Sequence, residues 1–561
     1  MKSFRSRLSF LSFVLLMGVF SKQINAATIE TKAESVKLIN IKIDNSTFAE
    51  ELESVQTNGV TYLKWSQAEH INQGDVGKPD IPTLQRLIVV DPTKVYETIL
   101  TIDSTSLLGD VNLYPVQPDA PEGSPSPKFA IDRKAYTLNK NFGAPWVEIG
   151  KTQRMGRFAV MPIKIHLAQY NPRKKELRYI NDLKITISAK DALATADAQF
   201  VTASQLTALE QLTLNGDSVI ADLSIPRKNG AYLVLTTDDL LPAARNFAER
   251  HREQGVTVYY ETIKPATGPS AIKNLIQNYY KTQNLEAVLL FGDETKVPLY
   301  SWSGTPGDSF YSMVDGDDGL ADILIGRIPA SNIAEADVFV QKTSVYEAGL
   351  SSGTSKSKNI MLVAHRESYP GKYTANLESV RTDPNLKNLE FSIQYGGRGA
   401  KNQSVIDLTE QNFSVINYRG HGSSQSWSGW GADGSSFGTT QINSVKNADT
   451  KMAVFFNIAC SNGAVQSSSK SMAERLLWPQ GDNPNRGAIA VLAATEPSLT
   501  AVNHKYNRHL FTHLQATASA SVGLVNMLAA NQLVRDAGGS VPSNNKMYIL
   551  FGDPLLAFKH D

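Results

Sequence analysis

The sequence Ser414-Val415-Ile416-Asn417-Tyr418-Arg419-Gly420-His421-Gly422 is an apolar run that ends on a histidine between two glycines. A second run, Met452-Ala453-Val454-Phe455-Phe456-Asn457-Ile458-Ala459-Cys460, ends on the only cysteine among the 561 residues. Short apolar runs bounded by turn residues are typical of buried strands. If the two strands are neighbours, their carboxyl ends bring His421 and Cys460 to the edge where α/β sheets bind ligands. This pair predicts nucleophilic catalysis, in which a thiolate attacks and an acid/base handles the leaving group.

The region around these two runs alternates between strand and helix patterns from residue 231 onward. Such alternation predicts a mostly parallel sheet with helices on its faces. A Ser-, Gly- and Lys-rich break at 351–358 divides the pattern. We therefore expect two α/β lobes side by side, lobe A over 230–350 and lobe B over 351–561.

The preceding part of the chain has a different pattern. Residues 27–200 are predicted to form a β-rich domain, because period-two runs such as Leu183-Lys184-Ile185-Thr186-Ile187-Ser188 alternate with Pro-, Gly- and Asn-containing turns. The stretch that follows is rich in Ala, Thr, Ser and Asp. We expect residues 201–229 to form an exposed linker, with Arg227-Lys228 as a candidate site of proteolytic cleavage.

The N-terminus has the features of a signal peptide over residues 1–26. Three basic residues (Lys2, Arg5 and Arg7) precede a largely apolar stretch at 8–20, which is too short to span a bilayer comfortably. No later stretch of sequence is long and apolar enough to span one. The sequence predicts an exported protein, extracellular or periplasmic, without a transmembrane anchor.

Charge and cysteine content limit the function further. The 55 Lys and Arg residues nearly balance the 54 Asp and Glu residues, which argues against nucleic acid as the main partner. A single cysteine cannot form an internal disulfide bond. Cys460 is therefore either a small buried apolar residue or a reactive thiol.

The His421 and Cys460 motifs resemble those of the gingipain-type cysteine peptidases, peptidase family C25, which are relatives of the caspases. The β-rich region is similar to the gingipain propeptide at Gln153–Arg157 and Tyr170–Pro172. The resemblance implies a zymogen with a β-rich prodomain and a caspase-like α/β catalytic region. Other segments with the same resemblance are Leu290-Phe291-Gly292-Asp293, Ile325-Gly326-Arg327, Phe437-Gly438-Thr439-Thr440 and Leu550-Phe551-Gly552-Asp553-Pro554.

The resemblance also implies roles for individual residues. Cys460 would be the nucleophile that forms a thioester acyl-enzyme, and His421 would be the acid/base. The backbone N–H groups of Gly422 and Cys460 would form the oxyanion hole. Glu367 occupies the position of the carboxylate that orients the histidine, although it can also be read as a solvated loop acid.

Specificity and inhibition carry over less directly. Arg-cleaving members place an aspartate shortly after the His-orienting acid, whereas residues 369–374 contain no acid and Glu378 is the available substitute. In related zymogens a basic loop of the prodomain blocks the cleft. Arg154 and Arg157 are candidates for that role, or they are simply charges at a strand edge.

Thiolate chemistry requires no cofactor. The acidic run with Asp315, Asp317, Asp318 and Asp322 is either a structural Ca²⁺ site or a solvated acidic turn.

Three functions stay open from the sequence. The first is an endopeptidase that cleaves protein or peptide substrates and is inhibited by its own prodomain. The second is a sortase-like transpeptidase, and the third is a non-catalytic binding or secretion-assembly protein with the same fold.

Overall fold

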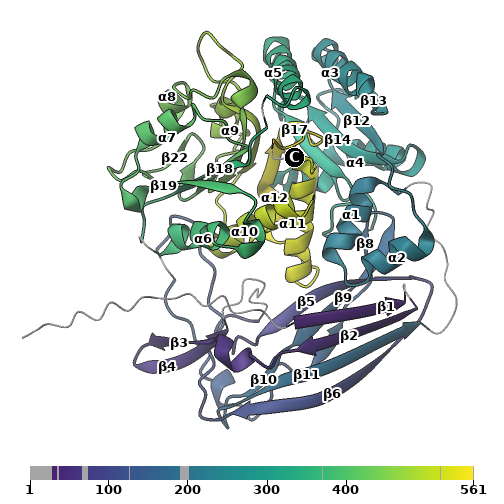
Figure 1. Ribbon diagram of the computed structural model, residues 1–561, viewed down its shortest axis with the longest axis vertical. Coiled ribbons are helices and arrows are strands. Elements are labelled where there is room, and N and C mark those ends of the chain that lie inside the picture. The colour runs from purple at the N-terminus through teal and green to yellow at the C-terminus, as the bar shows by residue number, and fades with distance from the viewer. Residues whose placement is uncertain are drawn as a thin grey trace, which may run out of the picture.

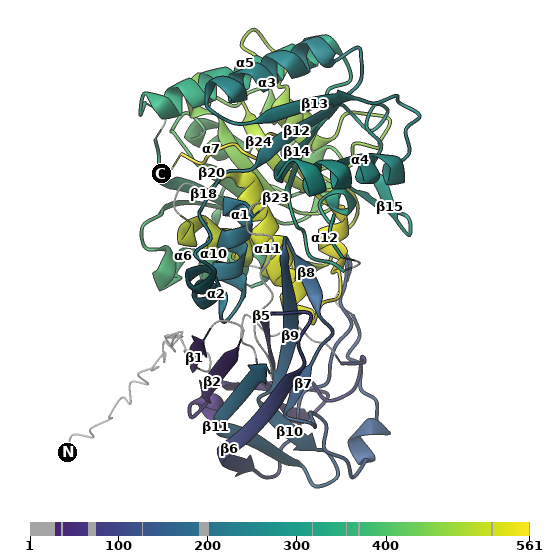
Figure 2. The same ribbon diagram turned by 90° about the vertical axis from the view of Figure 1, so that its right-hand side faces the viewer.

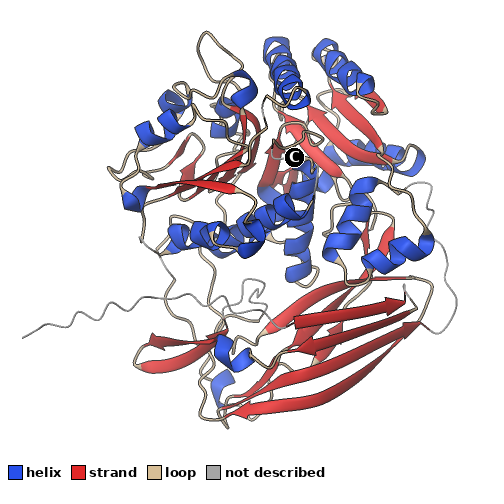
Figure 3. Ribbon diagram, viewed as in Figure 1, coloured by secondary structure: helices blue, strands red, loops and turns tan. Residues whose placement is uncertain are grey.

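The computed structural model describes residues 28–34, 37–65, 74–125, 127–189, 201–316, 318–354, 356–368, 371–517 and 520–559. The predicted signal peptide lies outside these residues. An N-terminal domain built almost wholly of strands lies below a larger α/β domain (Figures 1 and 3). Among the described residues, no helix combines the length and apolar character needed to cross a membrane.

The N-terminal domain contains two antiparallel sheets whose inner faces share one apolar core. In β2, Ile39, Ile41 and Ile43 are buried while the residues between them are exposed, because successive side chains of a strand point to opposite faces. One sheet consists of β1 (Thr28–Glu34), β2 (Leu38–Asp44), β6 (Tyr96–Leu108), β10 (Ala168–Asn171) and β11 (Glu176–Ala189). The other consists of β5 (Thr83–Val90), β7 (Val147–Ile149), β8 (Gln153–Met155) and β9 (Phe158–His166), and β3 (Leu52–Thr57) and β4 (Val60–Trp65) form a hairpin.

The α/β domain is built on a single ten-stranded sheet. In spatial order its strands are β13 (Val258–Thr262), β12 (Ala231–Thr236), β14 (Leu285–Phe291), β17 (Leu324–Ile328), β25 (Tyr548–Phe551), β24 (Ala488–Ala494), β23 (Ala453–Ile458), β20 (Val415–Arg419), β18 (Asn359–Ala364) and β19 (Glu390–Tyr395). Every neighbouring pair is parallel except β24 with β25. Strands of both expected lobes therefore belong to one sheet, because β25, near the end of the chain, lies between β17 and β24.

Helices cover both faces of this sheet. Figures 1 and 2 show α3 (Leu241–Glu253) and α5 (Ile333–Ser351) above it, and α6 (Lys372–Arg381), α10 (Thr500–Ala516) and α11 (Val522–Asp536) below it. The remaining α-helices of the domain are α4 (Pro269–Thr282), α7 (Asn402–Leu408), α8 (Thr439–Ile442), α9 (Met472–Leu477) and α12 (Ser543–Met547).

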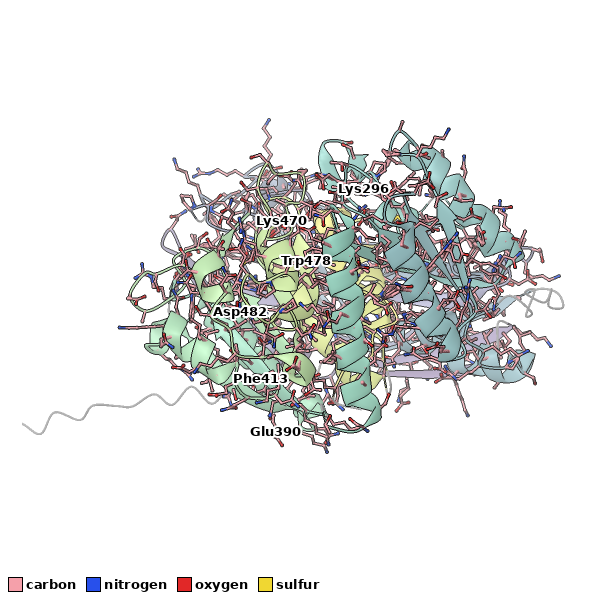
Figure 4. The ribbon with its side chains drawn as sticks, turned by 90° about the horizontal axis from the view of Figure 1, so that it is seen from above. Lys296, Glu390, Phe413, Lys470, Trp478 and Asp482 are labelled. Carbon is pink, nitrogen blue, oxygen red and sulfur yellow. The ribbon has the colours of Figure 1, made fainter. Side chains whose placement is uncertain are left out.

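Helix α5 joins the two halves of the domain. The indole N–H of Trp478, labelled in Figure 4, donates to the carbonyl oxygen of Glu335 on α5 over 3.0 Å. The buried Lys342 Nζ donates to the carbonyl oxygen of Arg486 over 2.9 Å and to that of Leu477. These contacts fix the half that carries His421 and Cys460 against the other half.

The expected linker is largely folded. It contains α1 (Ala203–Leu212) and α2 (Gly216–Leu223), and Leu206, Leu209, Leu212 and Val219 are buried in the main core. The apolar residues of α1 recur every three positions, so one face of the helix is apolar despite the polar composition of the stretch. The prediction of an exposed linker over 201–229 is therefore wrong for 201–225. Residues 226–229 are exposed and without regular structure.

Candidate active site

Strands β20 and β23 are parallel neighbours, and their register pairs Arg419 with Ile458. His421 and Cys460 each follow that pair by two residues. The register shows that the two strands are neighbours, which is the condition on which the predicted meeting of His421 and Cys460 depended. Both reactive side chains are thus carried past the carboxyl ends of adjacent strands in a sheet whose backbone is rigidly paired.

The carboxylate of Glu367 pairs with His421. Glu367 follows β18, which flanks β20 on the side away from β23. Its Oε2 contacts His421 Nε2, and Lys372 Nζ donates to its Oε1 over 3.0 Å. Burial acts to raise the pKa of Glu367, but the hydrogen bonds from Lys372 and His421 outweigh it and hold that pKa below its usual range. An ionised carboxylate on Nε2 assigns the proton there and leaves Nδ1 as the nitrogen that exchanges protons.

The Nδ1 side of His421 faces the hydroxyl group of a tyrosine and the backbone of the N-terminal domain. Tyr373 Oη lies 3.2 Å from Nδ1. Gly123, from the N-terminal domain, lies so close that a Cβ added to it would be 3.4 Å from Nδ1. The N-terminal domain therefore reaches the acid/base candidate directly.

The thiol of Cys460 is nearly closed off from solvent, with 6% of the residue exposed. The backbone N–H of Ser498 donates to Sγ over 3.3 Å, and Sγ lies 3.7 Å from the carbonyl oxygen of Glu122. Burial raises the pKa of the Cys460 thiol and the negative charge of Glu122 raises it further, against the opposing effects of Ser498 and Arg419. A raised pKa keeps the sulfur protonated, which is the unreactive form.

The segment 120–123 of the N-terminal domain crosses the site as an extra strand. The Glu122 N–H donates to the carbonyl oxygen of Ser498 over 2.9 Å, and the Thr500 N–H donates to the carbonyl oxygen of Ala120 over 3.2 Å. Pro121 forms an antiparallel bridge with Leu499. The segment is thus held by backbone hydrogen bonds to 498–500, and it lies between the nucleophile candidate and the acid/base candidate. It turns at Glu122 and Gly123, where the Ser124 N–H donates to the carbonyl oxygen of Pro121 over 3.1 Å.

The side chain of Glu122 enters a pocket that contains a buried arginine. Glu122 Oε1 lies 2.7 Å from Nη2 of Arg419, and both side chains are 0% exposed. Burial raises the pKa of Glu122, and the guanidinium of Arg419 opposes that rise.

Sequence reasoning did not identify Glu122. It lies in the connection between β6 and β7, residues 109–146, whose described residues (109–125 and 127–146) contain one short 3₁₀ helix, Ala135–Thr137, and no other helix. Long connections of this kind within a compact domain are often functional, and that length was the available signal.

Arg154 and Arg157 lie elsewhere. The Arg154 N–H donates to Asp318 Oδ2 over 2.6 Å, and its guanidinium pairs with Asp315 over 3.3 Å. The guanidinium of Arg157 packs over the ring of Tyr280 at 3.6 Å from its centroid. Both side chains thus contact the half of the α/β domain that does not carry His421 and Cys460. The structure therefore contradicts their assignment as the residues that block the cleft.

The same contacts engage the acidic run for which the sequence left open either a Ca²⁺ site or a solvated turn. Asp322 is buried and accepts backbone N–H groups of Gly156, Val314 and Asp315 over 2.7–2.9 Å. Asp317 lies outside the described residues. Among the described residues, the groups with metal-ligand proximity are His365–Glu367–His421 and His251–Glu347–Asp553, so Asp315, Asp318 and Asp322 do not form one. The geometry does not support the expected calcium site.

Glu378 is also occupied away from the site. Its carboxylate pairs with Arg381 over 2.6 Å and lies 4.0 Å from Arg398. It contacts neither Arg419 nor the segment 120–123 in the described structure, so it does not supply the carboxylate that an arginine side chain of a substrate would need.

Gly422 lies directly against Cys460. A Cβ at this position would overlap the carbonyl oxygen of Cys460 and lie 3.0 Å from Nδ2 of Asn462. Asn462 in turn donates to the carbonyl oxygen of Ser423 over 2.7 Å. The close approach requires glycine at position 422, whereas the oxyanion-hole role of the Gly422 and Cys460 amides stays a prediction.

Comparisons with known proteins agree with this geometry. The sequence model of peptidase family C25 matches residues 225–559, and that of the C25 propeptide matches residues 21–209. Gingipain R1 of Porphyromonas gingivalis is 22% identical over 490 residues, which cover 84% of this chain and 48% of Gingipain R1. Lys-gingipain of the same organism is 24% identical over 431 residues, which cover 71% of this chain and 24% of Lys-gingipain. The chain thus spans about half the length of Gingipain R1 and about a quarter of the length of Lys-gingipain.

Solved structures show the same fold. The structure of the Arg-specific cysteine proteinase gingipain R superimposes with a TM-score of 0.52 at 22% identity, over 59% of this chain and 78% of that one. The complex of the Porphyromonas gingivalis RgpB pro- and mature domains gives 0.52 at 21% identity, over 59% and 80%. The resemblance found in the sequence is confirmed, and the chain belongs to peptidase family C25.

Proposed function

We propose that this protein is an exported cysteine endopeptidase made as a zymogen, with a β-rich prodomain and a caspase-like catalytic region. One observation carries the proposal. A peptide segment lies between His421 and Cys460, with its carbonyl oxygen 3.7 Å from the sulfur. Membership of family C25 supports the same reading.

The proposed reaction uses only groups of this chain. The Cys460 thiolate attacks the carbonyl carbon of the scissile bond, and the N–H groups of Gly422 and Cys460 stabilise the oxyanion. The proton that Nδ1 of His421 takes from the Cys460 thiol passes to the leaving amine as the C–N bond breaks. Water then hydrolyses the thioester that remains, and its proton returns through His421 to the thiolate of Cys460. Glu367 holds Nε2 and so keeps Nδ1 directed toward the reacting groups. No step of this mechanism requires a cofactor.

Latency follows from the position of the segment 120–123. It occupies the path of a substrate, closes Cys460 from solvent and raises the pKa of the thiol. Cleavage in the exposed stretch 226–229, at Arg227-Lys228, would separate the prodomain from the catalytic chain and permit its release. Arg227 pairs with Glu210 on the surface, where a peptidase can reach it.

The test compares wild type with Cys460→Ala after limited proteolysis of the stretch 226–229. Both proteins are incubated with a mixed peptide library, with and without an added amine acceptor, and the products are identified by mass spectrometry. We expect cleavage by the wild type alone, with free carboxylates at the new ends. Products joined to the amine would favour transpeptidation, and equal cleavage by Cys460→Ala would refute Cys460 as nucleophile.

A further inference from the structure

We propose that the pocket around Arg419 selects an acidic residue, glutamate in preference to aspartate, immediately before the peptide bond that is cleaved. This inference rests on the proposed peptidase function and adds a substrate class to it. It arises from the way in which the segment 120–123 occupies the site.

The backbone register identifies Glu122 as the residue before the reactive bond. Its N–H and the carbonyl group of Ala120 both pair with the Ser498–Thr500 backbone, as in an antiparallel strand. Its own carbonyl oxygen faces Cys460 Sγ, and the next residue, Gly123, packs against Nδ1 of His421. The nucleophile thus lies at the Glu122–Gly123 bond, and the proton donor lies on the side of the leaving amine. The side chain of Glu122 occupies the pocket that a substrate residue would fill.

The pocket presents one fixed positive charge. Among the described residues, Arg419 forms a single ion pair, and its partner is Glu122. When the prodomain leaves, the structure offers no other carboxylate to Arg419. A guanidinium without a partner in a buried site is costly, so the empty pocket favours an anionic side chain over a neutral or cationic one.

The guanidinium is held in place before any substrate arrives. Its Nε donates to Asn376 Oδ1 over 3.2 Å, its Nη1 donates to the carbonyl oxygen of Ile458, and its Nη2 lies 2.9 Å from His504 Nδ1. Burial and the charge of Arg419 hold the pKa of His504 well below its usual range, so this imidazole is neutral and accepts the hydrogen bond. A preorganised donor loses little freedom on binding, which favours selectivity.

The geometry also distinguishes glutamate from its alternatives. A substrate arginine or lysine would place its cation against Arg419, and Glu378, the carboxylate expected to attract it, is paired with Arg381. An aspartate carboxylate would stop about 1.5 Å short of the position that Glu122 reaches. Glutamine has the size of glutamate without the charge and is therefore the informative comparison.

The experiment measures kcat/KM of the activated full chain, cleaved in the stretch 226–229, on acetyl-Ala-Pro-X-aminomethylcoumarin, which copies Ala120-Pro121-Glu122. X is Glu, Asp, Gln, Arg or Lys, and Cys460→Ala is the control. We expect Glu to exceed Gln by at least about tenfold, the scale of a charge-assisted hydrogen bond, and Arg and Lys to be the poorest. In Arg419→Gln, the ratio of Glu to Gln should fall toward one.

Variants of the prodomain residue that fills the pocket, which leave the catalytic region unchanged, keep the test valid if Arg419→Gln does not fold. In the full-length zymogen, Glu122→Arg should expose Cys460 to alkylation by iodoacetamide, whereas Glu122→Asp should expose it less. Tighter protection by Glu122→Arg would show that the pocket prefers cations and would overturn the inference. Cleavage after Arg or Lys, or equal rates for Glu and Gln, would overturn it while leaving the peptidase function standing. Failure to cleave any substrate, together with no labelling of Cys460 in the activated chain, would overturn both.

Discussion

Replacement of Glu122 by alanine tests how the zymogen stays latent. In the intact chain, Cys460 reacts with a small reagent only when the segment 120–123 leaves the cleft. The segment is held there by two backbone hydrogen bonds and by the fully buried pair of Glu122 and Arg419, 2.7 Å apart. Glu122→Ala would leave Arg419 buried without a counter-charge whenever the segment is in place.

The size of the effect follows from that burial. Removing one partner of a buried ion pair costs about 3–5 kcal/mol. At about 1.4 kcal/mol per factor of ten, the open state should become more populated by about a hundredfold to a few thousandfold. Water that enters the space left by the glutamate side chain reduces the cost, so we expect the lower end of this range.

The assay is the rate of alkylation of Cys460 by iodoacetamide in the uncleaved chain, followed by mass spectrometry. Glu53→Ala is the matched control, because Glu53 is an exposed carboxylate on β3. We expect the rate to rise at least about a hundredfold in Glu122→Ala and to stay unchanged in Glu53→Ala. A rate within about threefold of wild type, with an unchanged thermal unfolding temperature, would refute the argument, since about 0.6 kcal/mol is too small for a buried ion pair.

Three further predictions follow from the site and the fold. Burial under the prodomain and the charge of Glu122 raise the pKa of Cys460, so removal of the prodomain should shift the pH profile of alkylation to lower pH. At a pH below the pKa, the alkylation rate should rise about tenfold for each pH unit by which the pKa of the thiol falls. An unshifted profile would show that the prodomain does not raise the pKa of Cys460. Gly422→Ala should lower kcat/KM of the activated chain by at least about a hundredfold, because its Cβ would overlap the Cys460 carbonyl oxygen and displace the N–H groups of Gly422 and Cys460 from the substrate oxyanion, and activity close to that of wild type would rule out this close approach. Leu209→Ala should lower the free energy of unfolding by about 2–5 kcal/mol in urea, because Leu209 is fully buried, whereas a loss below about 0.5 kcal/mol would indicate that α1 is an exposed linker after all.

Much of the catalytic site could be predicted from local sequence. The two apolar runs ending in His421 and Cys460 indicated adjacent strand ends, since a buried parallel strand must be apolar throughout and its carboxyl end is where polar chemistry begins. Glu367 was assigned from the resemblance to the family, which places a carboxylate after a third strand, and the structure pairs it with His421. The β-rich and α/β regions were distinguishable because the period of the hydrophobic pattern indicates which faces of a strand or helix are buried.

Predictions made from local composition were wrong where long-range packing determines the structure. The stretch 201–225 is rich in polar residues, yet its few apolar side chains fall on one helical face that is buried in the main core. The continuity of the sheet depends on β25, which no local pattern places between β17 and β24. Asp315 and Asp318 looked like cation ligands, but the prodomain brings Arg154 to them.

The sequence by itself identified the candidate nucleophile, the candidate acid/base and the strands that carry them, because each of these is encoded within about ten consecutive residues. Only the tertiary structure decided what closes the site. Glu122 is 338 positions from Cys460 along the chain, and the carbonyl oxygen that faces the thiol is placed by the docking of one domain on another. Likewise Arg419 lies within an apolar strand motif, and its role in the closed site depends on the carboxylate of Glu122 that the fold brings to it. A charge buried at a strand end is recognisable in sequence, but its partner is a property of the fold.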